Sequence, residues 1–439
     1  MNHPQHKEYG RELLAFLNGC SSPYHAAADA ATMLTDSGFV ELNEGEAWEL
    51  KRGGKYFLRR NHSALIAFEM GDDPAIGGFR VIGAHTDSPG FKIKPGGCMI
   101  TGDGYVKLNT EPYGGSILSS WFDRPLSIAG RVTLKSDNAL RPQERLVDLL
   151  RPVAIIPNLC IHFNRDVNSG YAYNKQVDLL PLIGSMRNDL GNVDPVMGMV
   201  ASALDVSPSS IADFDLHLYE ADPGTAVGAD GEYLSASRID NLSMFYAGVI
   251  GLTQSGGNAC TKVLAAFDNE EVGSVSVPGA DSSFLVHVLR RICLCAGSGG
   301  EGYYRAVANS LAVSADCAHA VHPNYPEKHD PINRPVLGEG PAIKYSASQR
   351  YSTTAWTAAA FEQICRSASV PCQKFVNRSD IPGGSTIGPA LSSRTSIPTV
   401  DVGAPILAMH SVRELGSVID NVYSAMAFAE FYGYAEKTS

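Results

Sequence analysis

Four short apolar runs constrain the fold of this chain more strongly than any other feature of its sequence. Each is enriched in β-branched and small residues and is typical of a buried strand; the runs are Phe79–His85, Lys262–Phe267, Leu311–Asp316 and Pro398–Gly403. Amphipathic segments predict helices over Glu8–Leu17, Ser352–Ala368 and Glu414–Tyr432. Strands separated by helices predict an α/β fold, with a central, mostly parallel sheet flanked by helices.

Between about Pro95 and Ser235 the style of the sequence changes. Short strand-like pieces such as GYVKLNTEPYGG and GRVTLKS alternate with turns, and the earlier pattern resumes near Ser237. Since long buried-strand patterns stand on both sides of a block of short, turn-separated strand patterns, we expect an inserted, mainly β domain over residues 96–235. Residues 1–95 and 236–439 then form one discontinuous α/β domain.

The bulk composition excludes several classes of protein. A formal net charge of −11 argues against a protein that coats nucleic acid or an anionic membrane, because both need clustered Lys and Arg. No apolar run approaches the roughly 20 residues of a membrane span, and the N-terminus lacks the pattern of a secretion signal. Nine cysteines, an odd number without a framework spacing, indicate reduced thiols. We therefore expect a cytoplasmic protein.

Polar side chains follow the strand candidates or neighbouring turns. His85 ends the first run and Asp87 lies two residues on, where a carboxylate can fix the tautomer of a metal-binding imidazole. Asp240 stands just before a helical run in SRIDNLSM. Taken singly, each has an ordinary structural explanation, since a histidine at a strand end often serves packing and an Asp at this position is also a helix N-cap.

Three further clusters carry acidic residues and histidines. AAFDNEEVGS places Asp268, Glu270 and Glu271 at the end of an apolar run, although a solvated acidic turn would look the same. LAVSADCAHAVHPNY supplies Asp316 with His319 and His322 behind it, and TVDVGAPILAMHSVRE places His410 before a helix expected to begin near Arg413. Ligands of open α/β sheets bind at the carboxyl ends of the strands, where these clusters gather.

Together these histidines and carboxylates are the types of ligand that a site for two divalent cations requires. Two hydrolytic metal ions sit about 3.5–4 Å apart, and mixed His and carboxylate ligands suit zinc, with cobalt or manganese as alternatives, better than calcium or magnesium. One carboxylate must remain as general base, and the adjacent Glu270–Glu271 pair can divide the two tasks. Serine hydrolase and nucleotide-binding chemistry are unsupported, because neither GxSxG nor GxxxxGK[ST] occurs.

Seven ordered motifs resemble those of the aspartyl aminopeptidase family of metallopeptidases. They span nearly the whole chain: AHTDSPGFKIKP, SRIDNLSM, DNEEVGS, SADCAHAVHPNYPEKH, GPAIKYSASQRYST, GGSTIGP and DVGAPILAMHSVRE. The resemblance implies a catalytic domain with two zinc ions, interrupted by an inserted dimerisation or lid domain. It also implies a homo-oligomer, a tetrahedral dodecamer, that acts on small peptides.

The same resemblance assigns the metal ligands. His85 and Asp316 resemble the ligands of one metal ion, and Glu271 and His410 resemble those of the other. Asp240 resembles the carboxylate that bridges the two ions.

Glu270 resembles the general base, which takes a proton from the attacking water and returns it to the leaving amine. Asp87 resembles the residue that orients the metal-binding histidine. The reaction implied is removal of single residues from unblocked peptide N-termini.

Three further positions are implied to contact substrate. Lys344 and Tyr351 align with substrate-contacting positions, and a lysine there suits an N-terminal Asp or Glu. His162 resembles the histidine that the inserted domain offers to a neighbouring subunit's active site. Alternatives are a preference for neutral N-terminal residues, another di-metal hydrolase such as a deacylase, and a non-catalytic assembly protein.

Overall fold

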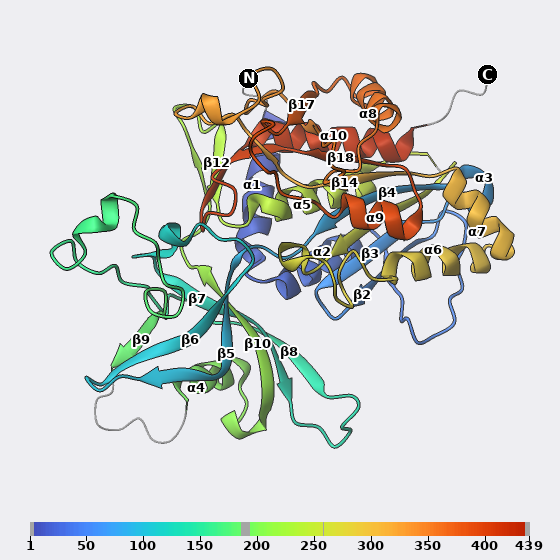
Figure 1. Ribbon diagram of the computed structural model, residues 1–439. Coiled ribbons are helices and arrows are strands. Elements are labelled where there is room, and N and C mark those ends of the chain that lie inside the picture. The colour runs from blue at the N-terminus through green and yellow to red at the C-terminus, as the bar shows by residue number, and fades with distance from the viewer. Residues whose placement is uncertain (1–3, 186–193, 258, 435–439) are drawn as a thin grey trace. The chain divides into compact units, whose positions relative to one another are not determined.

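A computed structural model describes residues 4–185, 194–257 and 259–434 of the chain (Figure 1). The protein folds as two compact units. The first comprises residues 1–87, 225–409 and 414–439, and the second comprises residues 88–224 and 410–413. The second unit is thus inserted in the sequence of the first. The inserted segment runs from residue 88 to residue 224, whereas the sequence analysis expected 96–235. The functions expected of the two domains stay predictions.

The first unit is built on a nine-stranded mixed sheet in which parallel neighbours predominate, among the described residues. In spatial order its strands are β1 (Val40–Glu41), β2 (Lys55–Arg60), β3 (Ala64–Glu69), β13 (Thr261–Phe267), β4 (Phe79–His85), β14 (Leu311–Ala315), β18 (Thr399–Gly403), β16 (Ala342–Tyr345) and β17 (Gln373–Val376). The α/β fold with a mostly parallel central sheet is therefore confirmed. All four predicted strands occur, and Phe79–His85 matches β4 residue for residue.

Helices cover both faces of this sheet (Figure 1). Alternate side chains of β4 separate the two cores, since Ile82 and Ala84 face one and Val81 faces the other. One face is covered by α1 (Pro4–Gly19), α2 (Pro23–Asp36), α5 (Ile239–Gln254), α8 (Ala355–Ser367) and α10 (Val418–Gly433). The other is covered by α6 (Phe284–Cys295), α7 (Gly299–Ala308) and α9 (Gly388–Thr395), with the short α3 (Pro74–Gly77) beside α7.

A small five-stranded sheet completes the first unit. Its strands are β11 (Thr225–Val227), β12 (Tyr233–Ala236), β20 (Glu414–Ser417), β19 (Pro405–Leu407) and β15 (Ala318–His319). The helix expected over Glu414–Tyr432, with a start near Arg413, is wrong at its beginning. Glu414–Ser417 pairs with both β12 and β19 as a strand, so the helix starts only at Val418.

The second unit is a six-stranded antiparallel sheet with one α-helix, α4 (Pro195–Leu204), among its described residues. Its strands are β8 (Gln143–Asp148), β7 (Leu126–Leu134), β10 (Ile211–Glu220), β5 (Gly90–Ile100), β6 (Tyr105–Tyr113) and β9 (Leu182–Ser185). Apolar side chains of these strands form a core of their own with α4. In the described part of the chain, no helix is long and apolar enough to cross a membrane.

Candidate metal centre

The carboxyl ends of parallel strands in the first unit bring several polar side chains to one edge of the sheet. His85 is the last residue of β4 and pairs in register with Phe267, the last residue of β13. β14, on the other side of β4, ends at Ala315, one residue before Asp316. Because these strands run parallel, the residues that follow them emerge together, as expected for a site on an open α/β sheet.

His85 is held in one orientation by the chain that follows it. Its Nδ1 lies 3.0 Å from the backbone carbonyl oxygen of Asp87; since a carbonyl can only accept, Nδ1 is the protonated nitrogen. Nε2 lies 3.8 Å from carboxylate oxygens of both Asp240 and Asp316. Two ligands about 2.1 Å from one tetrahedral zinc are roughly 3.4 Å apart, so the spacing suits a shared ion better than a hydrogen bond. All three side chains are buried.

Asp87 also positions the two adjacent glutamates. The backbone N–H groups of Glu270 and Glu271 donate to its two carboxylate oxygens, each over 3.1 Å. Asp87 is completely buried, and the glutamates occupy a 3₁₀ turn at Glu270–Val272. One carboxylate therefore fixes the turn that sets both glutamates beside His85, in addition to contacting the imidazole itself at 3.4 Å.

Asp240 lies in the first turn of α5, where its backbone departs from helical geometry (φ −77°, ψ 110°). It is not the N-cap of this helix, a position taken by Arg238. Its backbone N–H donates to the Glu414 carboxylate over 2.9 Å, and Glu414 is buried. The sequence reasoning missed Glu414, because only the long-range contact distinguishes it from any acidic residue near a helix start.

Two groups of three possible ligands consist entirely of residues of the first unit. His85, Asp240 and Asp316 make one group, and His85, Glu270 and Glu271 make the other; within each group the ligand atoms lie within 4.8 Å of one another. Imidazole nitrogen combined with carboxylate oxygen is a donor set that zinc, cobalt and manganese accept. The residues present therefore fit a divalent transition-metal centre.

Burial and mutual repulsion perturb the titration of this cluster. Burial alone lowers the pKa of His85, but its hydrogen bond to Asp87 and the charges of Glu270 and Asp316 outweigh it and raise the pKa well above the usual value. Burial raises the pKa of Glu270 to about 8, opposed by His85 and reinforced by Asp316, Asp87 and Asp240. Clustered perturbed pKa values are typical of functional sites.

Lys344 is buried rather than exposed, and its ammonium group reaches Asp316, one of the candidate metal ligands. Nζ donates to the Asp316 carboxylate over 3.1 Å and to the Cys317 carbonyl over 3.0 Å, and it lies 5.2 Å from the ring centroid of Tyr351. Burial lowers the pKa of Lys344, but Asp316, Tyr351 and Asp401 outweigh burial and raise it. Asp401, completely buried on β18, is a second carboxylate that the sequence reasoning missed; its only signal was a charge inside a strand of apolar neighbours.

The remaining candidate residues lie outside these two groups. His410 belongs to the second unit, where its Nδ1 donates to the Gly115 carbonyl over 3.1 Å, which leaves Nε2 as the acceptor nitrogen. His162 is exposed on a turn of the same unit. His319 stacks edge-on against Phe375, and His322 stacks against Tyr325.

Comparison with known proteins agrees with this chemistry. Residues 16–432 match the family model described as "Aminopeptidase I zinc metalloprotease (M18)". A "Probable M18 family aminopeptidase 2" of Clostridium acetobutylicum is 50% identical over 426 residues, which cover 97% of this chain and 98% of that protein. A protein of the same name from Ectopseudomonas mendocina is 41% identical, with coverage of 97% and 98%.

Solved structures resemble the fold throughout its length. The cryo-EM structure of an Ape4 and Nbr1 complex contains a chain with a TM-score of 0.94 and 36% identity, covering 98% of this chain and 86% of that one. The Saccharomyces cerevisiae mApe1 dodecamer gives a TM-score of 0.85 and 27% identity, with 98% of both chains covered.

Proposed function

Because the chain belongs to the M18 family of zinc aminopeptidases, we propose that it removes single N-terminal residues, preferably Asp or Glu, from small peptides, with two divalent metal ions per subunit. The observation that carries the proposal is the cluster of one histidine and four carboxylates at the strand ends, arranged as two overlapping ligand groups. Its location in the cytoplasm stays a prediction.

The proposed ligands divide between two ions. His85 and Asp316 bind one ion, Asp240 bridges, and Glu271 binds the other together with His410. His410 is only one peptide bond from Met409 of the first unit, and the chain returns to that unit at Glu414. Bound zinc ions supply polarisation of the scissile carbonyl and acidification of water.

Glu270 is proposed to move the proton. Its neighbour Glu271 serves as a ligand, while Asp87 holds the backbone of both glutamates in place. A carboxylate of raised pKa near the operating pH can accept a proton from water and return it to the leaving amine. The carboxylate of Asp87 and the backbone it fixes thus pre-arrange the base.

Lys344 is proposed to favour an acidic first residue. Its buried ammonium places positive charge beside Asp316 and near the ring of Tyr351. A buried cation attracts the carboxylate of an N-terminal Asp or Glu more strongly than one in water, because the local dielectric is low. Its hydrogen bond to Asp316 supports a second proposed task, which is to orient a proposed metal ligand.

Substrate preference separates these tasks of Lys344. With chromogenic Asp-, Glu-, Leu- and Lys-initiated substrates, we expect the wild type to favour Asp and Glu, and Lys344→Met to lower kcat/KM for these two by about 10²-fold, with little loss on Leu. Lys374→Met, on the neighbouring strand β17, is the control and should change nothing. A uniform loss on all substrates, with loss of bound metal, would show that Lys344 acts only through Asp316. A wild-type preference for Leu would keep the enzyme class and refute the acidic pocket.

Two other functions are separated by simple substrates. A deacylase on this scaffold would hydrolyse N-blocked substrates, whereas an aminopeptidase requires the free amine; N-acetylated peptides are therefore expected to resist cleavage. A non-catalytic assembly protein would cleave neither form under any metal. The gathering of His85 and four carboxylates in one cluster favours the catalytic alternative.

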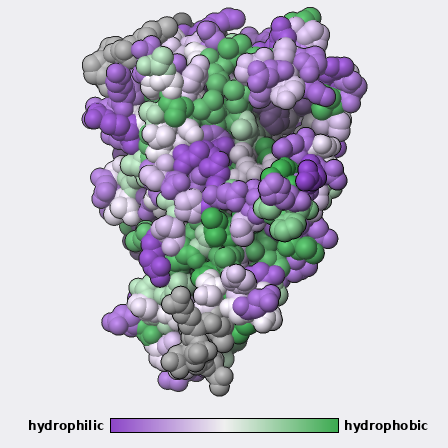
Figure 2. Space-filling model, turned by 90° about the vertical axis from the view of Figure 1, so that its left-hand side faces the viewer, coloured by the Kyte–Doolittle hydropathy of each residue, from purple (hydrophilic) through white to green (hydrophobic). Residues whose placement is uncertain are grey.

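We also propose that the protein forms a homo-oligomer, and that its arrangement is a tetrahedral dodecamer. The second unit exposes apolar side chains in the segment between β8 and β9, among them Leu159 (58% exposed), Ile161 (49%) and Phe163 (81%). On the face of this unit that is turned towards the viewer, Figure 2 shows apolar surface. Exposed apolar groups of this kind often mark protein interfaces, and the mApe1 relative is a dodecamer.

His162 lies between Ile161 and Phe163 in this exposed segment. If the two apolar side chains pack against a neighbouring subunit, His162 contacts that subunit as well. His162→Ala is expected to lower kcat roughly tenfold or more, the loss of a charge-assisted hydrogen bond, while leaving the oligomer intact. Turnover and light scattering measure both quantities. The control His287→Ala, on α6 of the first unit, should alter neither quantity. Unchanged turnover in the His162 variant would remove this residue from the active site.

A further inference from the structure

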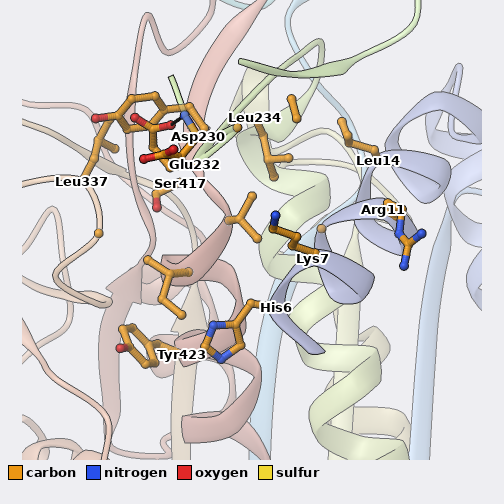
Figure 3. Close-up of a pocket in the computed structure, with 17 residues that line it drawn as sticks. His6, Lys7, Arg11, Leu14, Asp230, Glu232, Leu234, Leu337, Ser417 and Tyr423 are labelled. Atoms are coloured by element: carbon orange, nitrogen blue, oxygen red, sulfur yellow. Dashed lines mark hydrogen bonds between the residues drawn. The ribbon is translucent and has the colours of Figure 1, made fainter. Parts of the chain in front are cut away.

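A cavity in the first unit shares no residue with the metal centre. Its volume is about 760 Å³, within the range of about 300–1,000 Å³ that is typical of small-molecule sites. Its walls come from α1, from the hairpin of β11 and β12, and from the N-terminal turn of α10 (Figure 3). No motif in the sequence drew attention to these residues.

Charges of opposite sign stand on two walls of this cavity. α1 contributes His6, Lys7 and Arg11, of which Lys7 and Arg11 are one helical turn apart, and the hairpin contributes Asp230 and Glu232. Figure 3 shows Lys7 extending from α1 into the cavity, with the two acidic side chains on the opposite wall. Within the part of the chain that the structure describes, Lys7, Arg11, Asp230 and Glu232 form no ion pair. The cavity thus presents separated charges that a ligand can neutralise.

Ser417 adds a hydroxyl group that is not used to cap its helix. The residue is 3% exposed and occupies the N-cap of α10, yet its side chain makes no capping hydrogen bond. A serine at this position normally accepts from the backbone of the first helical turn, and here it does not. Figure 3 shows Ser417 lining the cavity beneath the acidic wall.

Apolar side chains line the space between the charged walls. They are Leu14 of α1, Leu234 of β12, Leu337 and Val418. A lone anion would satisfy only the basic wall and a lone cation only the acidic one. A short peptide in its zwitterionic form satisfies both, because its ammonium and carboxylate groups are separated by its own length, about 3.3–3.6 Å per extended residue.

We propose that this cavity is a non-catalytic binding site for short zwitterionic peptides with apolar side chains. Asp230, Glu232 and the Ser417 hydroxyl receive the peptide ammonium group, and Lys7 receives the terminal carboxylate. The apolar walls hold the side chains between them. The proposal stands independently of the hydrolytic site, since no proposed metal ligand lines the cavity.

The test is calorimetric titration of the full-length holoprotein with a leucine tripeptide whose first amide is N-methylated, which resists hydrolysis while keeping both terminal charges. Lys7→Glu and Asp230→Lys are each expected to weaken binding at least about tenfold. The exposed residues Lys51 and Asp72 lie outside the cavity, so Lys51→Glu and Asp72→Lys are charge-matched controls that should leave binding unchanged. All four variants should hydrolyse a chromogenic substrate at the wild-type rate.

Blocked probes decide which end of the peptide meets which wall. Amidation of the carboxylate should weaken binding to the wild type but strengthen binding to Lys7→Glu, whose new carboxylate repels the peptide carboxylate; N-acetylation should behave likewise with Asp230→Lys. Equal effects of the blocks in wild type and variants would show that the peptide termini do not meet Lys7 and Asp230, and would overturn the proposal. Absence of binding, or displacement of the peptide by inorganic phosphate with no dependence on the N-terminal block, would overturn it as well.

Discussion

Replacement of Glu270 by glutamine is expected to lower kcat by about 10²- to 10⁴-fold, the usual contribution of a general base, while leaving metal content unchanged. Glutamine keeps the shape of the side chain but cannot accept the proton. The backbone N–H of residue 270 still donates to Asp87, so the turn should persist. Turnover and metal content, measured by mass spectrometry of the purified variant, give the two readouts.

Glu271→Gln is the matched contrast, because the same substitution one residue away affects a proposed ligand. Loss of bound metal is expected there, together with loss of activity, since a neutral amide is a weaker ligand than a carboxylate. If Glu270→Gln loses metal and Glu271→Gln keeps it, the two roles are reversed. Retained turnover in Glu270→Gln would show that another group takes the proton.

Local patterns in the sequence predicted most of the elements that build the candidate metal centre. β4 and β13 are continuous apolar runs because both faces of their sheet are covered, so their composition alone marked them. The polar residues behind them could be expected to gather, since parallel strands deliver their carboxyl ends to one edge. His85 and the two glutamates do lie together there.

What sequence patterns missed depends on contacts between distant segments. Glu414–Ser417 becomes a strand because it pairs with β12, about 180 residues earlier in the chain, and no local propensity records such a partner. Glu414 contacts the backbone of Asp240 for the same reason. Lys344 would ordinarily be a surface lysine, and only tertiary packing turns its ammonium towards Asp316.

Removal of metal by a chelator is expected to abolish turnover and to lower thermal stability, with both restored by zinc, cobalt or manganese. Asp240 and Asp316 are buried beside His85, and carboxylates so placed repel one another unless a cation stands between them. An ion present at about 100 to 1,000 times its Kd stabilises the folded state by about 2.7 to 4.1 kcal/mol, which corresponds to a Tm increase of roughly 3–5 °C for a chain of 439 residues. Turnover and Tm should therefore be measured on the same chelated and reloaded samples.

The variant Asp316→Asn separates metal binding from non-specific effects of the chelator. With one proposed ligand weakened, its Tm should respond much less to added zinc than the Tm of the wild type. In Asp316→Asn the buried Lys344 ammonium loses its carboxylate partner, which by itself lowers stability. The double variant Asp316→Asn/Lys344→Met removes this unpaired charge and is therefore the control. If the wild type keeps full activity when mass spectrometry finds no bound metal, the cluster at the strand ends is not a catalytic metal centre. If zinc raises the Tm of Asp316→Asn as much as that of the wild type, the ion binds elsewhere in the protein, and the assignment of Asp316 must be abandoned.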